Sequence, residues 1–290
     1  MEDYKQTLIF LHLHRTGGTT LFFIMKRYFD ADTIHRIDET KKTKKNSTEY
    51  FLNLPQKQRD RIKLLRGHMP FGLHAYFSHP CDYITILRDP AERIFSEYSR
   101  FIMWPDRSHI KNFEKLDGMT FKDFINSRLV AVNNYQTSVL SGNWKGQYEE
   151  AEPLGWEALE KAKDNLIRYF KMVGTTDRHD ETILVLAKKF GWKNYYYFEK
   201  KNISKRDNSI PEECRKIIAD RNKLDIELYN FAGRMLDEAI VSYGQNFNKD
   251  LRRLRYANKI LTRFWKIGRR MPFFLRKPVK LMLPIGLRWE

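Results

Sequence analysis

Two short segments of this sequence gather side chains that bind anions. The first runs from Arg15 to Thr20 and contains one guanidinium, two adjacent glycines and several threonine hydroxyls. Two glycines let the backbone approach a ligand closely, and a helix that begins here presents unpaired N–H groups at the positive end of its dipole. We therefore predict a phosphate or sulfate site; the alternative is an ordinary tight turn between a strand and a helix. The residues of this predicted site are Arg15, Thr16, Gly17, Gly18, Thr19 and Thr20.

The second segment runs from Leu87 to Tyr98 and combines Arg88 with Ser96. Arg88 follows an apolar run that is typical of a buried strand, and open α/β sheets bind ligands at the carboxyl ends of their strands. Ser96 lies about two turns into the helix expected to follow. A guanidinium and a hydroxyl that arrive from two elements suit a second phosphate. The alternative is a surface ion pair of Arg88 with Glu92 and a hydroxyl that faces solvent.

His68 is the main candidate for proton transfer among the eight histidines. It follows a short apolar run and Gly67, and it precedes a turn-rich segment expected at the ligand edge of the sheet. A hydroxyl that attacks as a nucleophile needs a base with a pKa near neutrality, and imidazole fits this requirement. His74 and a carboxylate are the alternatives for the base. His12 lies within an apolar run and is expected to be a core histidine.

Strands and helices must alternate along the chain to position these residues. Apolar runs predict strands at Thr7–Leu13, Ile62–Leu65, Tyr83–Leu87, Lys171–Gly174 and Asn194–Phe198. Helices are predicted after the first turn, from Ala91, from Thr176 or Asp177 to about Phe190, and from Pro211 to about Tyr243. This alternation predicts an α/β fold with a parallel sheet that helices wrap on both faces.

The charge of the chain is unevenly distributed. The 290 residues carry a net charge of +17, and the segment from Lys249 to Glu290 holds 13 basic and two acidic residues. We therefore predict one domain at residues 1–247 and a basic, aromatic-rich extension at residues 248–290. A basic extension favours an anionic partner: nucleic acid, acidic lipid, or a sulfated or carboxylated polymer such as a polyanionic acceptor. The alternative is that its aromatic residues pack back onto the domain while the charges are solvated.

Composition excludes several classes of protein. An aromatic content of 14% excludes dominant disorder, and two cysteines, Cys81 and Cys214, exclude a disulfide scaffold and a zinc site with several cysteine ligands. No targeting signal is visible at Met1, so we expect a cytoplasmic location. The apolar segment from Met271 to Leu287 contains three prolines and three basic residues, so it is expected to lie on a membrane surface rather than to cross it.

With both anion-binding segments in view, the sequence resembles the sulfotransferases that use 3′-phosphoadenosine 5′-phosphosulfate (PAPS). The similarity is to the carbohydrate branch that includes heparan sulfate 2-O-sulfotransferase and bacterial sulfotransferases. His12 to Leu21 are similar to its 5′-phosphosulfate loop, HxPKTGGTTL, and Leu87 to Tyr98 match its 3′-phosphate motif, LRDPxERxxSxY. The pair Gly67-His68 matches the pair that carries the catalytic base of the family. Two separate phosphate motifs in the family order make this similarity specific, and it extends over about Thr7 to Lys205.

The resemblance implies a P-loop-like fold and further site residues. Asn134 to Thr137 resemble the NxQT segment of the family, which assigns substrate binding to Asn134 and Gln136, with His74 as a further candidate. Asn202 to Lys205 resemble a loop that closes over the nucleotide, which adds Ser204 and Lys205 to the donor site. Arg15 replaces the usual lysine of the loop, and His14 replaces the usual proline. An arginine still neutralises a leaving phosphate, but it does not place a compact ammonium on the bridging oxygen.

The function predicted from these residues is transfer of a sulfuryl group from PAPS to a carbohydrate hydroxyl, with in-line attack. Arg15 and the helix start hold the phosphosulfate, Arg88 and Ser96 hold the 3′-phosphate, and His68 takes the acceptor proton. We expect no metal, because cationic side chains neutralise the charge, and no nucleic-acid partner. The carbohydrate acceptor is expected to be neutral or anionic. The alternative function is non-catalytic binding of a polyanion; a kinase is disfavoured, because GxxxxGK[ST] is absent.

Overall fold

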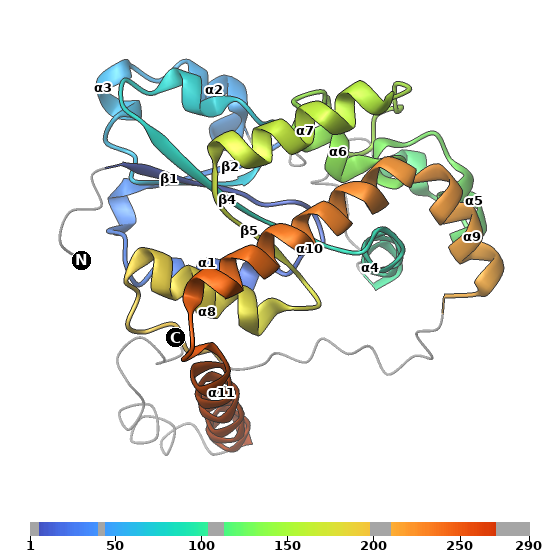
Figure 1. Ribbon diagram of the computed structural model, residues 1–290. Helices are drawn as coiled ribbons and strands as arrows, with labels where there is room; N and C mark the ends of the chain where they lie inside the picture. Colours follow the sequence, from blue (N-terminus) through green and yellow to red (C-terminus); the bar gives the residue numbers. More distant parts are fainter. Residues whose placement is uncertain (1–5, 40–43, 104–112, 198–209, 271–290) are drawn as a thin grey trace.

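The computed structural model describes residues 6–39, 44–103, 113–197 and 210–270. Its centre is a five-stranded parallel sheet with the strand order β2-β3-β1-β4-β5 (Figure 1). The strands are β1 (Thr7–Leu11), β2 (Ile34–Asp38), β3 (Leu64–His68), β4 (Cys81–Leu87) and β5 (Phe170–Thr175). The parallel sheet with surrounding helices confirms the predicted α/β class.

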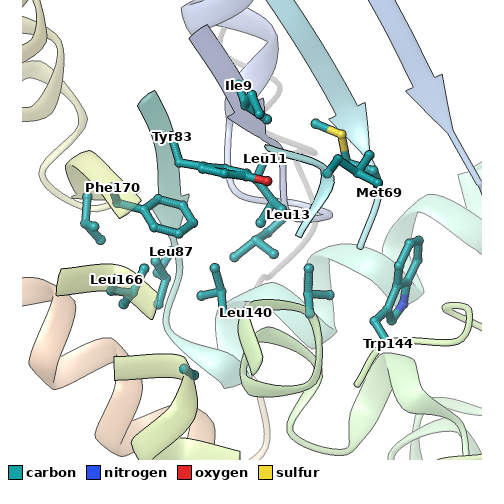
Figure 2. Packing of buried hydrophobic residues seen from close by; sticks show 14 of the residues in the cluster. Ile9, Leu11, Leu13, Met69, Tyr83, Leu87, Leu140, Trp144, Leu166 and Phe170 are labelled. Atoms are coloured by element: carbon teal, nitrogen blue, oxygen red, sulfur yellow. The ribbon is translucent and has the colours of Figure 1, made fainter. Parts of the chain in front are cut away.

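The central strand β1 is buried on both faces, which explains its nearly continuous apolar sequence. Alternate side chains enter opposite cores, because successive residues of a strand point to opposite sides. Leu8 and Phe10 belong to one cluster, whereas Ile9 and Leu11 belong to the other. Figure 2 shows part of the second cluster, in which Tyr83 lies among aliphatic side chains from the strands and helices.

Helices cover both faces of the sheet and one of its edges. The cluster that contains Ile9 includes residues of α2 (Thr48–Leu52), α6 (Tyr135–Ser141) and α7 (Trp156–Tyr169). The cluster that contains Leu8 includes residues of α1 (Gly18–Met25) and α8 (His179–Phe190). The long helix α10 (Lys223–Tyr243) contributes to both clusters and runs beside β5 (Figure 1).

A third core lies beyond the end of the sheet that carries the predicted site. It joins α4 (Pro90–Met103), α5 (Phe121–Asn126) and α9 (Glu212–Arg221). The remaining elements are α3 (Gln56–Arg59) and five short 3₁₀ segments, at Ala31–Thr33, Lys44–Asn46, Leu73–Tyr76, Phe113–Leu116 and Val130–Val132. Because α4 starts directly after β4, this core fixes the helix that carries Ser96.

Three details differ from the sequence-based expectations. The strand β2 was not predicted, because its sequence, IHRID, has no continuous apolar run. Residues 194–197 of the strand predicted at Asn194–Phe198 have no strand pairing, and the backbone N–H of Tyr197 donates instead to Asn258 Oδ1 at 3.0 Å; Phe198 lies outside the described residues. The single helix predicted from Pro211 to Tyr243 is divided into α9 and α10, which meet at Asn222.

The basic extension begins with a helix that packs on the domain. This helix, α11 (Phe247–Arg270), inserts Phe247, Leu251 and Leu254 into the cluster that contains Leu8. Its first turns therefore belong to the same core as the central strand. Within the described part of the chain, no helix combines the length and apolarity that a membrane span requires.

Candidate active site

The turn between β1 and α1 is held in a strained shape by its own hydrogen bonds. Arg15 and Gly17 adopt left-handed backbone angles, with φ of 67° and 80°. The Thr16 hydroxyl donates to the Leu13 carbonyl at 2.9 Å, and the Thr176 hydroxyl donates to the Thr16 carbonyl at 3.0 Å. Such contacts are needed to keep a non-glycine residue such as Arg15 in this conformation. The turn is thus a fixed structure, positioned by β1 and by the segment after β5.

The turn leads directly into α1, a helix whose N-terminus has no side-chain cap. Gly17 is the N-cap of α1, no side chain caps the first backbone N–H groups, and the first turn contains no acidic residue. Gly18 is required here because a Cβ at this position would lie 2.3 Å from Cδ2 of His12. Thr19 is exposed and Thr20 is half-buried in this first turn. Free N–H groups at the positive end of a helix dipole suit an oxyanion.

The two predicted phosphate segments are joined through Arg15. Its Nε donates to Ser96 Oγ on α4 at 3.0 Å, and its carbonyl accepts a hydrogen bond from Arg88 Nη1 at 3.0 Å. The pKa of both guanidinium groups is lowered, chiefly because burial disfavours their charged form. Among the described residues, Arg88 forms an ion pair only with Glu92, at 3.8 Å, and the Glu92 side chain is 44% exposed. Two desolvated cations at one place favour an anionic ligand.

The backbone of Arg88 is fixed by Gln136. The Arg88 N–H donates to Gln136 Oε1 at 2.9 Å, and Gln136 Nε2 donates to the Arg88 carbonyl at 2.8 Å. The Gln136 side chain is fully buried, so its amide has no surface that faces a substrate. Gln136 therefore positions Arg88, and both ends of its amide are used for that purpose; direct contact of Gln136 with a substrate stays a prediction.

Asn134 also has structural partners. It adopts φ of 46° at the N-terminus of α6, and its side-chain oxygen accepts from the backbone N–H groups of Leu224 and Asp225 at 3.1 and 3.2 Å. His74 lies apart from the turn, where its Nδ1 is 3.2 Å from the Tyr83 hydroxyl and its ring is 4.4 Å from that of Tyr169. Substrate binding by these two residues stays a prediction. Ser204 and Lys205 lie outside the described residues.

His68 ends β3 beside the turn, and one contact fixes its tautomer. Its Nδ1 lies 2.6 Å from the carbonyl oxygen of His12. A carbonyl only accepts hydrogen bonds, so Nδ1 carries the proton and Nε2 retains a lone pair in the neutral ring. The ring stacks on that of His14, with centroids 3.5 Å apart. Burial lowers the pKa of His68 to about 3, so the ring is neutral at physiological pH.

A cavity of about 260 Å³ brings His68 and the helix start together. It is lined by His12, Gly18, Thr19, Phe22, Phe23, Arg36, Arg66, Gly67 and His68. His12 therefore lines the cavity, which corrects the expectation of a core histidine. Arg36 and Arg66 were not predicted either, although Arg66 directly precedes the Gly67-His68 pair. In the described ranges, no group of three or more histidine, cysteine or acidic residues is arranged to hold a metal ion.

The cationic groups at the end of the sheet suit an anionic ligand, and the comparison with known families shows which class of protein this is. The chain belongs to the sulfotransferase family, whose model matches residues 2–232. The family resemblance carried by the two phosphate motifs is therefore confirmed.

Curated relatives of this chain are named heparan-sulfate 6-O-sulfotransferases. The chain is similar to heparan-sulfate 6-O-sulfotransferase 2 of Mus musculus, with 26% identity over 87% of this chain and 47% of that protein. The Homo sapiens protein of the same name is 25% identical over 87% of this chain and 48% of its own length. The chain is also 23% identical to heparan-sulfate 6-O-sulfotransferase 3 of Homo sapiens, over 79% of this chain and 57% of that protein.

The chain spans about half the length of the two heparan-sulfate 6-O-sulfotransferases 2. These relatives carry the 6-O name, whereas the motif comparison pointed to the 2-O branch. The family match shows that the chain is a member of the sulfotransferases.

Proposed function

We propose that this protein transfers a sulfuryl group from PAPS to a hydroxyl of a carbohydrate, with His68 as the base. The observation that carries the proposal is the contact between Arg15 and Ser96, with the Arg88 guanidinium on the Arg15 carbonyl. It joins two anion-binding segments that are about 70 residues apart in sequence into one cationic site beside His68. A donor with phosphate groups at both ends of its ribose matches a site with two anion-binding parts.

Each residue has a role that follows from its chemistry. Arg88 and Ser96 bind the 3′-phosphate, and the N–H groups at the start of α1 bind the 5′-phosphosulfate. Arg15 neutralises the charge that develops on the departing 5′-phosphate. His68 accepts the hydroxyl proton at Nε2 as the new oxygen–sulfur bond forms and the bond from sulfur to the bridging oxygen breaks. Negative charge bound at the turn would raise the pKa of His68 and make it a stronger base.

The donor site is tested by comparing two nucleotides that differ only in the 3′-phosphate. Arg88→Ala is expected to weaken binding of adenosine 3′,5′-bisphosphate by about 10- to 150-fold, the equivalent of one charge-assisted contact of roughly 1.5–3 kcal/mol. Adenosine 5′-monophosphate should bind both proteins alike. Arg168→Ala is the matched control, because Arg168 pairs with Asp164 on the exposed side of α7. An equal loss of affinity for both nucleotides would contradict the assignment of Arg88 to the 3′-phosphate.

The alternative is a protein that binds polyanions without catalysis. The basic residues that are exposed in the described part of α11 favour it; they are Lys249, Arg252, Arg253, Arg255, Lys259 and Arg263. Incubation with labelled PAPS and a panel of glycans separates the two functions: the proposed enzyme releases adenosine 3′,5′-bisphosphate and labels an acceptor. A protein that binds the glycans but is not stabilised by adenosine 3′,5′-bisphosphate in a thermal-shift assay would support the alternative.

A further inference from the structure

Three histidine rings lie together beside the turn that follows β1. The His68 ring is 3.5 Å from the ring of His14 and 4.6 Å from the ring of His12, measured between centroids. The hydrogen bond between Nδ1 and the His12 carbonyl holds one atom of the His68 ring, and one hydrogen bond alone allows the ring to tilt about it. The close stack with His14, at an interplanar angle of 21°, restrains this tilt. The direction of Nε2 therefore depends on where the His14 ring lies.

The place of His14 depends in turn on Tyr135. The backbone N–H of His14 donates to the Tyr135 hydroxyl at 3.2 Å, and the two rings meet edge to face with centroids 6.1 Å apart. The exposed fraction is 2% for His14 and 1% for Tyr135, so the hydroxyl satisfies a buried backbone donor. The proline that His14 replaces in the loop motif has no N–H and needs no such partner. The Tyr135 hydroxyl thus meets a requirement that the histidine of this chain creates.

Tyr135 is itself held by two helices. It is the first residue of α6, directly after the N-cap Asn134, and the Arg93 guanidinium of α4 lies over its ring, with the guanidinium carbon 4.6 Å from the centroid. Arg93 is fully buried, and its Nη2 donates to the Ala131 carbonyl. A cation over an aromatic face is attracted to it, most strongly where water is excluded. The Tyr135 hydroxyl therefore has a fixed position relative to the turn.

We propose, resting on the proposed function, that Tyr135 is a positioning residue for sulfuryl transfer. Its hydroxyl holds the His14 ring against His68, and this stack directs Nε2 toward the acceptor hydroxyl. A misplacement of about 1 Å in a reacting group can cost on the order of 10²-fold in rate. Because the hydrogen bonds of Thr16 and Thr176 hold the turn without Tyr135, loss of its hydroxyl acts on the base more than on donor binding.

The kinetic test removes the hydroxyl and keeps the ring. Tyr135→Phe should lower kcat on the order of 10- to 100-fold, with labelled PAPS and the glycan that wild type labels fastest, and leave KM for PAPS nearly unchanged. Tyr28→Phe is the matched control, because the Tyr28 hydroxyl also accepts from a backbone N–H, that of Asn194, beyond the C-terminal end of α1. It should leave both constants near their wild-type values. Thermal unfolding and adenosine 3′,5′-bisphosphate binding verify the fold of each variant.

A second variant tests the route through His14. His14→Ala removes the stacked ring and keeps the N–H that donates to Tyr135, so it should lower kcat to a similar extent. It also keeps the inference testable if Tyr135→Phe does not fold. Because Tyr135 acts through this ring, adding Tyr135→Phe to His14→Ala should cause little further loss. Losses that multiply in the double variant would overturn the route through His14.

A spectroscopic readout tests the contact without turnover. In protein with isotope-labelled histidines, the His14 ring at 3.5 Å displaces the resonance of the His68 Cε1–H through its ring current. Tyr135→Phe should move this resonance toward its position in His14→Ala, whereas Tyr28→Phe should leave it in place. An unmoved resonance in Tyr135→Phe, or a fall in kcat no larger than that in Tyr28→Phe, would overturn the inference.

Failure of the proposed function would give a different result. His68→Ala would then keep wild-type turnover, or no glycan of the panel would be labelled, while Tyr135→Phe still moved the His68 resonance. That outcome would leave the contact from Tyr135 through His14 to His68 in place and overturn its role in transfer. If His68→Ala is inactive and the resonance does not move in Tyr135→Phe, the proposed function holds and the inference about Tyr135 is wrong.

Discussion

The tautomer of His68 follows from a single contact, and the chemistry assigned to the residue depends on it. With Nδ1 held by the His12 carbonyl at 2.6 Å, only Nε2 is able to take up a proton. His68→Ala is therefore expected to lower turnover on the order of 10²–10⁴-fold while binding of adenosine 3′,5′-bisphosphate stays nearly unchanged. The assay is transfer from labelled PAPS, with bisphosphate affinity measured in parallel.

His74→Ala tests the alternative base. The His74 ring lies against Tyr83 and Tyr169 rather than at the turn, so we expect its removal to lower turnover much less than removal of His68 does, even if His74 contacts the acceptor. If His68→Ala keeps more than a tenth of wild-type turnover, the base is another group, and a large loss in His74→Ala would identify it.

The histidines around the site should also make the folded protein sensitive to acid. Burial holds the pKa of His14 well below its usual value, and that of His68 at about 3. In the unfolded chain, a histidine takes up its proton near pH 6.5. Below that pH the unfolded state binds more protons than the folded state, so the stability present above pH 6.5 is lost as the pH falls toward the folded pKa.

The size of this effect is measurable by urea unfolding between pH 7.5 and 5. Each such histidine contributes a slope of at most about 1.4 kcal/mol per pH unit. His14→Phe keeps a ring against His68 and removes one of the titrating groups, so its free energy of unfolding should fall less steeply with acid than that of wild type. If the free energy of unfolding falls equally with pH in the two proteins, His14 does not contribute to the acid sensitivity. This holds whatever the difference between their stabilities at pH 7.5.

At the residue scale, the sequence indicated candidate residues that lie in continuous motifs. It did not indicate residues such as Arg36, which reach the cavity only through the pairing of strands. Arg15, Arg88 and His68 were identifiable because each lies at the end of a strand or beside a glycine, and Ser96 because it lies in the same motif as Arg88. Arg36 is part of the cavity only because β2 pairs with β3 in a particular register, and no spacing in the sequence encodes that pairing.

At the scale of elements, strands with an apolar run were predictable and the edge strand β2 was not. The strands β1 and β4 are apolar on both faces, so their sequences are continuous apolar runs. The edge strand β2 has an exposed Arg36 and a buried Ile37, which leaves too little pattern for a prediction. The opposite error, at residues 194–197, arose because tyrosine-rich sequence has strand propensity. In the structure, the backbone N–H groups of Asn194 and Tyr197 donate to the Tyr28 hydroxyl and to Asn258 Oδ1 instead of to a neighbouring strand.

Two helices near the site cap each other, and this gives a prediction for Asn134. Its side-chain oxygen accepts from the first N–H groups of α10, while the Asp225 carboxylate accepts from the N–H groups of Gln136 and Thr137 on α6. Asn134→Ala removes one cap and places a side chain with no local hydrogen bond at φ of 46°. We expect a loss of about 1–3 kcal/mol in the free energy of unfolding.

Asn134→Gly separates the two contributions. Glycine tolerates the left-handed conformation but provides no cap, so its stability should fall between those of wild type and Asn134→Ala. Because α6 carries Gln136, which fixes Arg88, bisphosphate affinity should decrease in the same order. Urea unfolding and nucleotide titration measure the two effects; an alanine variant as stable as wild type would show that the cap contributes nothing.

At the scale of the whole molecule, the basic extension and the domain share a core. Phe247, Leu251 and Leu254 of α11 are buried with residues of β1 and α8, so truncation after Phe247 removes core side chains as well as charge. Such a truncation is therefore expected to lower stability, and it does not isolate the role of the charge. Changes on the outer side of α11 are the sharper test.

Three basic residues form a stripe on that outer side. Arg252, Lys259 and Arg263 are exposed, and spacings of seven and four residues bring them to the same side of a helix. Exposed Tyr256 and Phe264 accompany them. Basic residues at an acidic lipid surface contribute about 1 kcal/mol each, and aromatic side chains insert at the interface, so we predict that this stripe binds anionic vesicles.

The test replaces all three basic residues by glutamine in the full chain and leaves the buried side of α11 unchanged. Wild-type protein should co-sediment with vesicles that contain phosphatidylserine, bind neutral vesicles much less, and lose the interaction as salt screens the charges. The triple variant should bind the anionic vesicles on the order of 100-fold more weakly, since three contributions of about 1 kcal/mol are removed. Its thermal stability and its turnover on small acceptors should match wild type. If wild type does not bind vesicles and the variant loses turnover only on long anionic acceptors, the stripe belongs to the acceptor site. If the variant matches wild type in both vesicle binding and turnover, the charges of the stripe are solvated and bind neither partner.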